Sequence, residues 1–160
     1  MNAGIFLKRT AIAALPVMAV SALGGLVTAP NIPAWYAGLV KPPGTPPNWL
    51  FGPVWTALYV AMAVAIWRIL AVPEGTPGRG KAIVLFFVQL ALNCAWSFAF
   101  FGARNPRLGL VVISALLVAI AATIAAFRPF DRLAALLLVP YLAWVLYASW
   151  LNVGVWWLNG

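Results

Sequence analysis

The chain has 160 residues, of which 65% are hydrophobic and only 8% are charged. Soluble domains carry about 25% charged residues, so this composition indicates an integral membrane protein whose excess apolar surface faces lipid. The sequence has no histidine and only two acidic residues, Glu74 and Asp131. It therefore excludes Ser-His-Asp catalysis and histidine-ligated metal or haem sites, and we expect no required cofactor.

Uncharged stretches between basic residues predict the membrane spans, because a spanning helix needs about 20 apolar residues. Such stretches follow Arg9, Lys41, Lys81, Arg107 and Arg132. They predict five transmembrane helices, at about residues 6–28, 51–72, 81–102, 107–127 and 133–157. The expected fold class is therefore an all-α membrane protein, a five-transmembrane-helix bundle forming a single transmembrane domain over residues 1–160.

The first apolar run also has features of a secretory signal peptide. Lys8 and Arg9 precede it, and Val27-Thr28-Ala29 resembles a cleavage site. However, the run is longer than the 7–15 residues of a usual signal-peptide core, and Pro30 would follow the cut. We therefore predict a helix that is retained.

The connection between the first and second predicted helices, residues 30–50, is much longer than the others. It contains six prolines: Pro30, Pro33, Pro42, Pro43, Pro46 and Pro47. It also contains Trp35, Tyr36 and Trp49. Proline restricts the backbone, and aromatic rings supply apolar surface to bury. We expect an ordered Pro/Trp-rich loop that covers one end of the bundle, and a long ordered loop is often functional.

The formal net charge of +8 comes from Lys and Arg at the ends of the apolar runs, where they meet lipid headgroups. We therefore expect the lipid bilayer, and no nucleic acid, as the partner of these charges. The side of the N-terminus carries seven of them, Lys8, Arg9, Arg68, Arg79, Lys81, Arg128 and Arg132, and the other side three, Lys41, Arg104 and Arg107. Since cytoplasmic loops are enriched in Lys and Arg, this bias predicts a cytoplasmic N-terminus.

The third predicted helix carries Gln89, Asn93, Trp96 and Phe100 at spacings that place them on one helical face. Two amides one turn apart are costly when they face lipid, so this face should turn toward the bundle interior. The amides would serve there either as interhelical hydrogen-bonding groups or as polar anchors in a ligand cavity.

Large aromatic residues recur at helical spacing on two further helices. The second helix contributes Trp55 and Tyr59, and the fifth contributes Tyr141 and Trp144, followed by the small Ala148 and then Leu151. These faces suit a flat-walled apolar pocket for a planar hydrophobic ligand. Ordinary core packing is the alternative interpretation.

A series of small residues, Ala91, Ala95 and Ala99, lies on the third helix. Small residues four apart permit close helix approach, either within the bundle or across a homodimer.

Several of these segments resemble the translocator protein family, also called tryptophan-rich sensory protein, TspO or the peripheral benzodiazepine receptor. They are WYAGLVKPP (35–43), PPNW (46–49), GPVWTALY (52–59), QLALNCAW (89–96), FFG (100–102), PYLAW (140–144) and ASWLN (148–152). The resemblance covers about residues 33–158 and suggests a bacterial member in the cell envelope.

The resemblance implies homodimers and a pocket under the first loop. It implies that the pocket binds porphyrins such as protoporphyrin IX, sterols in some members, and synthetic benzodiazepine-site ligands. The family's pocket residues fall on Trp49, Trp55, Gln89, Asn93, Trp96, Trp144 and Ala148. The residue patterns add Lys41, as a cation for the porphyrin propionates, and Tyr59, Phe100, Tyr141 and Leu151 as further candidates.

Three functions fit this resemblance. We expect a membrane receptor, sensor or carrier that binds porphyrins, without catalytic residues of its own. The alternatives are an enzyme that degrades porphyrin in light and a passive transporter of tetrapyrroles or sterols. No Lys or Arg follows Tyr147, so the sterol-associated pattern of animal members is absent. Ion-driven pumping is disfavoured, because both acidic residues lie at helix ends.

Overall fold

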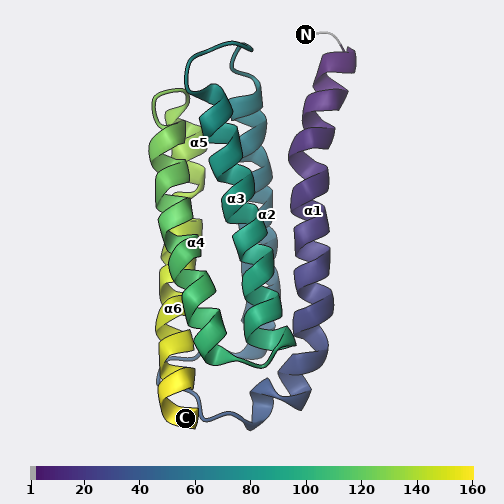
Figure 1. Ribbon diagram of the computed structural model, residues 1–160. Helices are drawn as coiled ribbons and strands as arrows, with labels where there is room; N and C mark the ends of the chain where they lie inside the picture. The colour runs from purple at the N-terminus through teal and green to yellow at the C-terminus, as the bar shows by residue number, and fades with distance from the viewer. Residues whose placement is uncertain (1–2) are drawn as a thin grey trace.

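The computed structural model describes residues 3–160, which form a bundle of antiparallel helices (Figure 1). Within these residues, five segments are long and apolar enough to cross a bilayer. They are α1 (Ala3–Ala34), α2 (Asn48–Leu70), α3 (Arg79–Ser97) with the π-helical turn η2 (Phe98–Gly102), α4 (Pro106–Phe127), and α5 (Arg132–Leu137) with α6 (Val139–Asn159). The predicted five-helix fold is confirmed. Residues 1 and 2 of the predicted domain lie outside the described residues.

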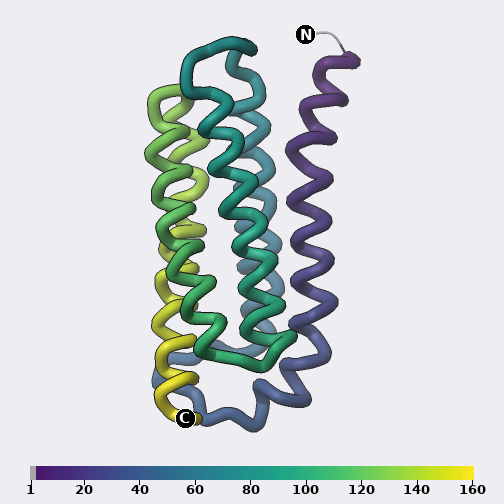
Figure 2. The backbone as a smooth tube through the Cα atoms, in the orientation of Figure 1, coloured from purple at the N-terminus to yellow at the C-terminus, as the bar shows by residue number. Residues whose placement is uncertain are grey.

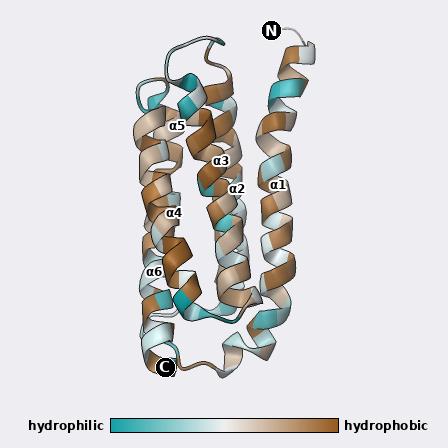
Figure 3. Cartoon of the chain, viewed as in Figure 1, coloured by the Kyte–Doolittle hydropathy of each residue, from teal (hydrophilic) through white to brown (hydrophobic). Residues whose placement is uncertain are grey.

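The helices run up and down between two ends of the bundle (Figure 2). The start of α1, the α2–α3 turn and the α4–α5 turn lie at one end, which we call the N-terminal end. The end of α6 lies at the other, which we call the C-terminal end. Figure 3 shows hydrophobic residues along most of the length of the helices, as expected for elements that face lipid on their outer sides.

The connection after α1 is shorter than the sequence predicted. Helix α1 continues through Pro30 and Pro33 to Ala34, a 3₁₀ turn η1 follows at Tyr36–Gly38, and α2 begins at Asn48. The extended loop is therefore confined to residues 39–47 instead of 30–50. Proline has a backbone angle compatible with a helix, and apolar surroundings favour helical backbone, which satisfies its own polar groups.

The fifth span is broken, whereas the sequence analysis treated residues 133–157 as one helix. The break lies at Leu138, between α5 and α6. Pro140 has no N–H to donate to the preceding turn, which removes one helical hydrogen bond here, and it lies in the first turn of α6, where that N–H is not needed. The third span also departs from a regular helix, because its last turn, η2, is π-helical.

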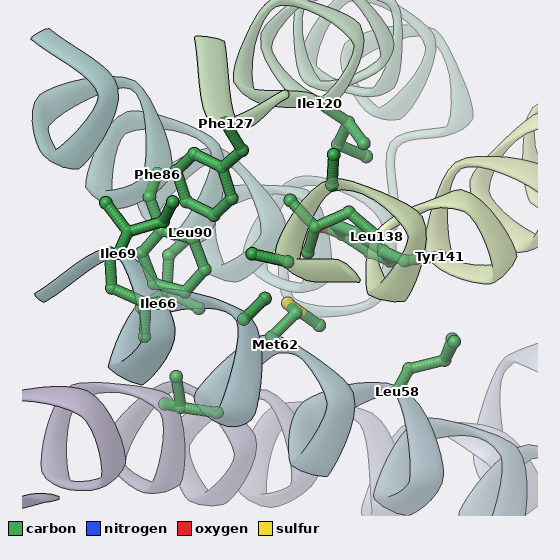
Figure 4. Close-up of a cluster of buried hydrophobic side chains, with 14 of the residues drawn as sticks. Leu58, Met62, Ile66, Ile69, Phe86, Leu90, Ile120, Phe127, Leu138 and Tyr141 are labelled. Carbon is green, nitrogen blue, oxygen red and sulfur yellow. The ribbon is translucent and has the colours of Figure 1, made fainter. Parts of the chain in front are cut away.

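Buried hydrophobic side chains fill the half of the bundle near the N-terminal end. Met62, Ile66, Phe86 and Phe127 are inaccessible to solvent there, and the two phenyl rings stack with centroids 6.1 Å apart. Figure 4 shows side chains from α2, α3, α4 and the α5–α6 span gathered into this cluster, which we call the packed half. Its close packing contrasts with the opposite half, where a cavity lies.

Candidate ligand cavity

A cavity of about 340 Å³ lies in the half of the bundle near the C-terminal end. Helices α1, α2, α3 with η2, and α6 form its walls, and Tyr36 of η1 joins them. The aromatic residues that line it are Tyr36, Phe51, Trp55, Tyr59, Trp96, Phe100, Phe101 and Trp144. Its volume is near the lower end of the range of about 300–1,000 Å³ for small-molecule sites.

Three indole rings, those of Trp55, Trp96 and Trp144, come from three different helices. Neighbouring rings hold each of them. Trp96 stacks on Phe100 with centroids 5.2 Å apart, and Trp144 meets Phe51 edge-on at 6.0 Å. The result is a cavity with flat, rigid and mostly apolar walls, which suits a planar hydrophobic molecule.

Asn152 of α6 fixes the orientation of Trp96. The indole Nε1 donates to Asn152 Oδ1 at 3.1 Å, and Asn152 Nδ2 donates to the carbonyl oxygen of Pro106 at 2.9 Å. Gly109 of α4 makes room for this arrangement, because a Cβ there would lie 2.8 Å from Asn152 Oδ1 and 3.0 Å from the Phe100 ring. One buried amide, itself part of the cavity wall, therefore ties α3, α4 and α6 together.

Small residues of α1 form another part of the cavity wall. Ser21, Gly24, Gly25, Thr28 and Ala29 all line the cavity. A small-residue wall leaves space that larger side chains would fill.

The cavity opens sideways between α1 and α2. Gly25 and Ala29 on α1 line it and are exposed, as are Gly52 and Thr56 on α2. A Cβ added at either glycine would have no atom within 4 Å. Since both helices are long and apolar enough to cross a membrane, we expect this opening to face lipid.

A hydrogen-bonded layer of three side chains closes the deep end of the cavity. The hydroxyl of Tyr59 donates to Asn93 Oδ1 at 2.8 Å, and Asn93 Nδ2 donates to the hydroxyl of Tyr141 at 3.1 Å. Tyr59 lines the cavity, whereas Asn93 and Tyr141 are buried behind it. One turn farther along α3, Gln89 is fully buried, and neither of its amide atoms has a hydrogen-bond partner.

Tyr36 and the loop 39–47 cover the other end. Tyr36 is 5% exposed and contacts Phe100 and Phe101. Burial, and to a lesser extent the neighbouring Tyr147, raise the pKa of Tyr36, so its phenol is neutral at physiological pH.

Helix α6 holds the loop 39–47 in place. Asn159 exchanges two hydrogen bonds with the backbone of Val40, both at 3.0 Å. Pro42 packs on Gly154, where a Cβ would come within 2.6 Å of the proline ring. The loop is ordered and covers the C-terminal end of the bundle, as Figure 1 shows.

Comparison with known proteins decides the family. The profile of the TspO/MBR family matches residues 12–158. The chain belongs to this family. It is 44% identical over 145 residues to tryptophan-rich protein TspO of Archaeoglobus fulgidus, which covers 91% of this chain and 93% of that protein.

Two further relatives come from an animal and a bacterium. Human translocator protein is 46% identical over 127 residues, 76% of this chain and 73% of that protein. The tryptophan-rich sensory protein of Cereibacter sphaeroides is 38% identical over 118 residues, 74% of this chain and 72% of that protein. The predicted membership of the TspO/MBR family and the integral membrane location are thereby established.

The structure brings together seven of the residues that the sequence analysis selected for this TspO/MBR chain. Those that line the cavity are Trp55, Trp96, Trp144, Ala148, Tyr59, Phe100 and Leu151. Their role in ligand binding stays a prediction. The sequence analysis did not select the α1 wall. The small residues Gly24, Gly25, Thr28 and Ala29 were the available signal, but the aromatic Phe6 and the amide Asn31 of α1 do not line the cavity and so do not identify its inner face.

Five selected residues do not line the cavity. Trp49 is 72% exposed, because it lies in the first turn of α2, where its neighbours Asn48 and Phe51 face the cavity instead. Gln89, Asn93 and Tyr141 are buried behind the deep end. Lys41 Nζ lies 4.9 Å from the centroid of the Tyr36 ring and donates to the carbonyl oxygens of Ala37 and Leu39, so it contacts the covering segment.

The small residues of α3 divide between two environments. Ala91 and Ala95 are exposed on the outer face, whereas Ala99 is buried within the bundle. Homodimer formation through α3 and the orientation of the N-terminus both stay predictions.

Proposed function

We propose that this chain is a membrane receptor that binds a flat hydrophobic ligand of the porphyrin class in the ligand cavity. The observation that carries the proposal is the arrangement of three indole rings, from α2, α3 and α6, around one space that opens toward lipid. Aromatic walls bind planar π-systems through stacking and edge contacts. A hydrophobic ligand dissolved in the bilayer would reach this space without crossing water.

The polarity of the cavity supports a ligand whose charges stay outside. Its polar lining consists of hydroxyl and amide groups from residues such as Ser21, Thr28, Asn48 and Thr56, without a charged side chain among the described residues that line it. Burying a carboxylate without a cation is costly. We therefore expect porphyrin propionates to project through the α1–α2 opening. This differs from the role that the sequence analysis expected for Lys41.

The size of the cavity supports the same placement. With a volume of about 340 Å³, it would enclose part of a substituted macrocycle, while the remainder lies in the opening between α1 and α2. Smaller apolar molecules, including sterols and synthetic benzodiazepine-site ligands, would compete for the same walls.

A receptor is favoured over a carrier that passes its ligand through the bundle. The cavity ends at the layer of Tyr59, Asn93 and Tyr141, and beyond it lie fully buried side chains such as Met62 and Phe86. In this conformation, the packed half offers no path to the N-terminal end for a rigid macrocycle.

Titration of the detergent-purified protein with protoporphyrin IX tests the proposal. We expect saturable tryptophan quenching and a shifted porphyrin absorption band, with one site per chain and competition by a benzodiazepine-site ligand. Linear quenching, equal to that of an unrelated membrane protein, would mean that the porphyrin partitions into detergent and would refute the proposal.

Illumination of the same complex addresses the enzymatic alternative. Trp55 and Trp144 line the cavity, so a bound porphyrin would contact oxidisable indoles. A receptor predicts bleaching no faster than that of free porphyrin in the same detergent. Faster bleaching, with a porphyrin breakdown product, would favour the degrading enzyme.

A further inference from the structure

One buried hydroxyl in the ligand cavity has no partner within the part of the chain that the structure describes. The buried polar side chains there are Gln89, Asn93, Ser97, Thr123 and Asn152. Of these, only Ser97 and Asn152 line the cavity. Both ends of the Asn152 amide are used, by Trp96 and by the Pro106 carbonyl. In contrast, no hydrogen bond joins Ser97 Oγ to another described residue.

The position of Ser97 in its helix makes this unusual. Helical serines elsewhere in the chain donate to the carbonyl oxygen one turn earlier, as Ser114 and Ser149 do at 2.8 and 2.7 Å. Ser97 is the last residue of α3, directly before the π-helical turn η2, and is 8% exposed. A buried hydroxyl without a partner is costly. One that borders a cavity therefore indicates where a polar group of a ligand would bind.

The Ser97 hydroxyl lies against a gap that Gly24 leaves on α1. A Cβ at Gly24 would lie 3.3 Å from Ser97 Oγ and 4.0 Å from the hydroxyl oxygen of Tyr59. The Tyr59 hydroxyl already donates to Asn93, and its oxygen can still accept a hydrogen bond. Gly24, Tyr59 and Ser97 all line the cavity. We call these three residues the hydroxyl subsite.

The subsite suits an uncharged group that accepts a hydrogen bond. No charged side chain lines the cavity among the described residues, so an ionised group would be buried there without a counter-charge. A carbonyl oxygen accepts from Ser97 and needs no counter-charge. Tyr59 belongs to the layer at the deep end, so a porphyrin whose propionates project through the α1–α2 opening would turn its opposite edge toward the subsite.

We propose that Ser97 is a specificity-determining residue, which donates a hydrogen bond to an uncharged oxygen on the macrocycle edge opposite the propionates. This inference rests on the proposed function and narrows its ligand class. Flat tetrapyrroles with a carbonyl group on that edge bind more tightly than those that carry only hydrocarbon there. Gly24 is required because a side chain at its position would fill the space beside the hydroxyl.

Two porphyrins test the subsite with the full chain in detergent. Diacetyldeuteroporphyrin IX and mesoporphyrin IX share the macrocycle and both propionates, but the first carries acetyl groups where the second carries ethyl groups, on the edge opposite the propionates. An ethyl group would leave the Ser97 hydroxyl buried without a partner. We therefore expect the acetyl compound to bind about fivefold or more tightly in the tryptophan-quenching titration. Infrared spectra should show a lowered acetyl C=O stretching frequency in the complex.

Variants assign the preference to one hydroxyl. Ser97→Ala should abolish it and return the C=O frequency to the value in detergent, while mesoporphyrin still binds. Ser149→Ala is the matched control, because the Ser149 hydroxyl bonds within α6 and does not line the cavity. It should retain both the preference and the lowered frequency. Gly24→Ala places a methyl group beside Ser97 Oγ and should reduce the preference as well.

The possible failures are distinguishable. Equal affinity of the unmodified chain for the two porphyrins, or a preference that Ser97→Ala preserves, would overturn the subsite and leave the porphyrin cavity standing. Either result would mean that Ser97 bonds to its own helix when a ligand is bound. Absence of saturable binding by both porphyrins would instead refute the proposed function, and the subsite with it.

Discussion

The two halves of the bundle are built from the same five spans but are filled differently. In the packed half, aliphatic side chains and the stacked pair Phe86 and Phe127 exclude solvent completely. In the cavity half, Asn152 orients the Trp96 indole, and small residues of α1 line the same space. The layer of Tyr59, Asn93 and Tyr141 separates the two.

This contrast shows that hydrophobicity alone does not decide whether a membrane bundle is solid or hollow. Branched and flexible side chains, such as Ile66 and Met62, adapt to fill space. Rigid indoles cannot, particularly when a hydrogen bond holds the ring, as at Trp96. Stability should therefore depend mainly on the packed half, and ligand binding on the cavity half.

The largest effect on stability is expected from Phe86→Ala, in the packed half. Phe86 is fully buried and contacts Phe127 and Phe87. Its truncation leaves a cavity, which should lower the free energy of unfolding by about 3–5 kcal/mol. Unfolding in mixed detergent, followed by tryptophan fluorescence, measures the loss. A decrease in the free energy of unfolding below about 1 kcal/mol would contradict this contrast, because the packed half would then not dominate stability.

The largest effect on binding is expected from Trp144→Ala, in the cavity half. We expect porphyrin affinity to fall by about 1–3 kcal/mol, the scale of a lost aromatic contact at a binding site. Stability should change less than in Phe86→Ala, since Trp144 borders space. Trp157→Ala is the matched control, because Trp157 is 79% exposed and lies outside the cavity. Equal affinity of both variants in the titration would remove Trp144 from the site.

The boundary between the halves is tested by Asn93→Leu. This change removes the partner of the buried Tyr141 hydroxyl and should cost about 1–3 kcal/mol of stability. Gln89→Met is the control one turn away. Because the Gln89 amide is buried without partners, an apolar replacement of similar shape should be neutral or stabilising. A large loss in Gln89→Met would show that the polar layer extends to Gln89.

The smallest effect is expected at the rim of the packed half, where Asp131 meets Arg68. Burial raises the pKa of Asp131, but the Ala134 N–H and the Arg68 guanidinium lower it more, so the net pKa is below its usual value. Asp131→Asn keeps a capping oxygen for α5 and removes the charge, so it should cost about 0.2–1 kcal/mol near neutral pH.

The pH dependence of this difference follows from the sign of the shift. A depressed carboxyl pKa stabilises the fold at pH values above the unfolded pKa of about 3.9, and this stabilisation is lost as the pH falls through the folded pKa. Unfolding of both proteins from pH 7 down to pH 3 should therefore show a constant difference that shrinks below about pH 4. A difference that grows in acid would contradict the assignment.

Much of the fold was predictable because the bilayer imposes simple rules. Long runs without charge had to span, so the five spans followed from the positions of residues such as Arg9, Lys81 and Arg132. The inward placement of Gln89 and Asn93 followed from the cost of amides in lipid. These inferences need only local composition and the 3.6-residue period of a helix.

Only the tertiary structure decided which inward faces enclose space. Periodicity places Trp96 and Asn93 on one face, but the depth of each residue relative to other helices determines that Trp96 lines the cavity and Asn93 does not. The α1 wall depends on which face of α1 packs inward. Likewise, Trp49 and Lys41 lie outside the cavity. Trp49 belongs to α2, which begins earlier than its proline-rich surroundings suggested. Lys41 follows η1, a tighter turn than those surroundings suggested. Sequence determines the local period, whereas the heights and rotations of neighbouring helices are set by packing between residues distant in the chain.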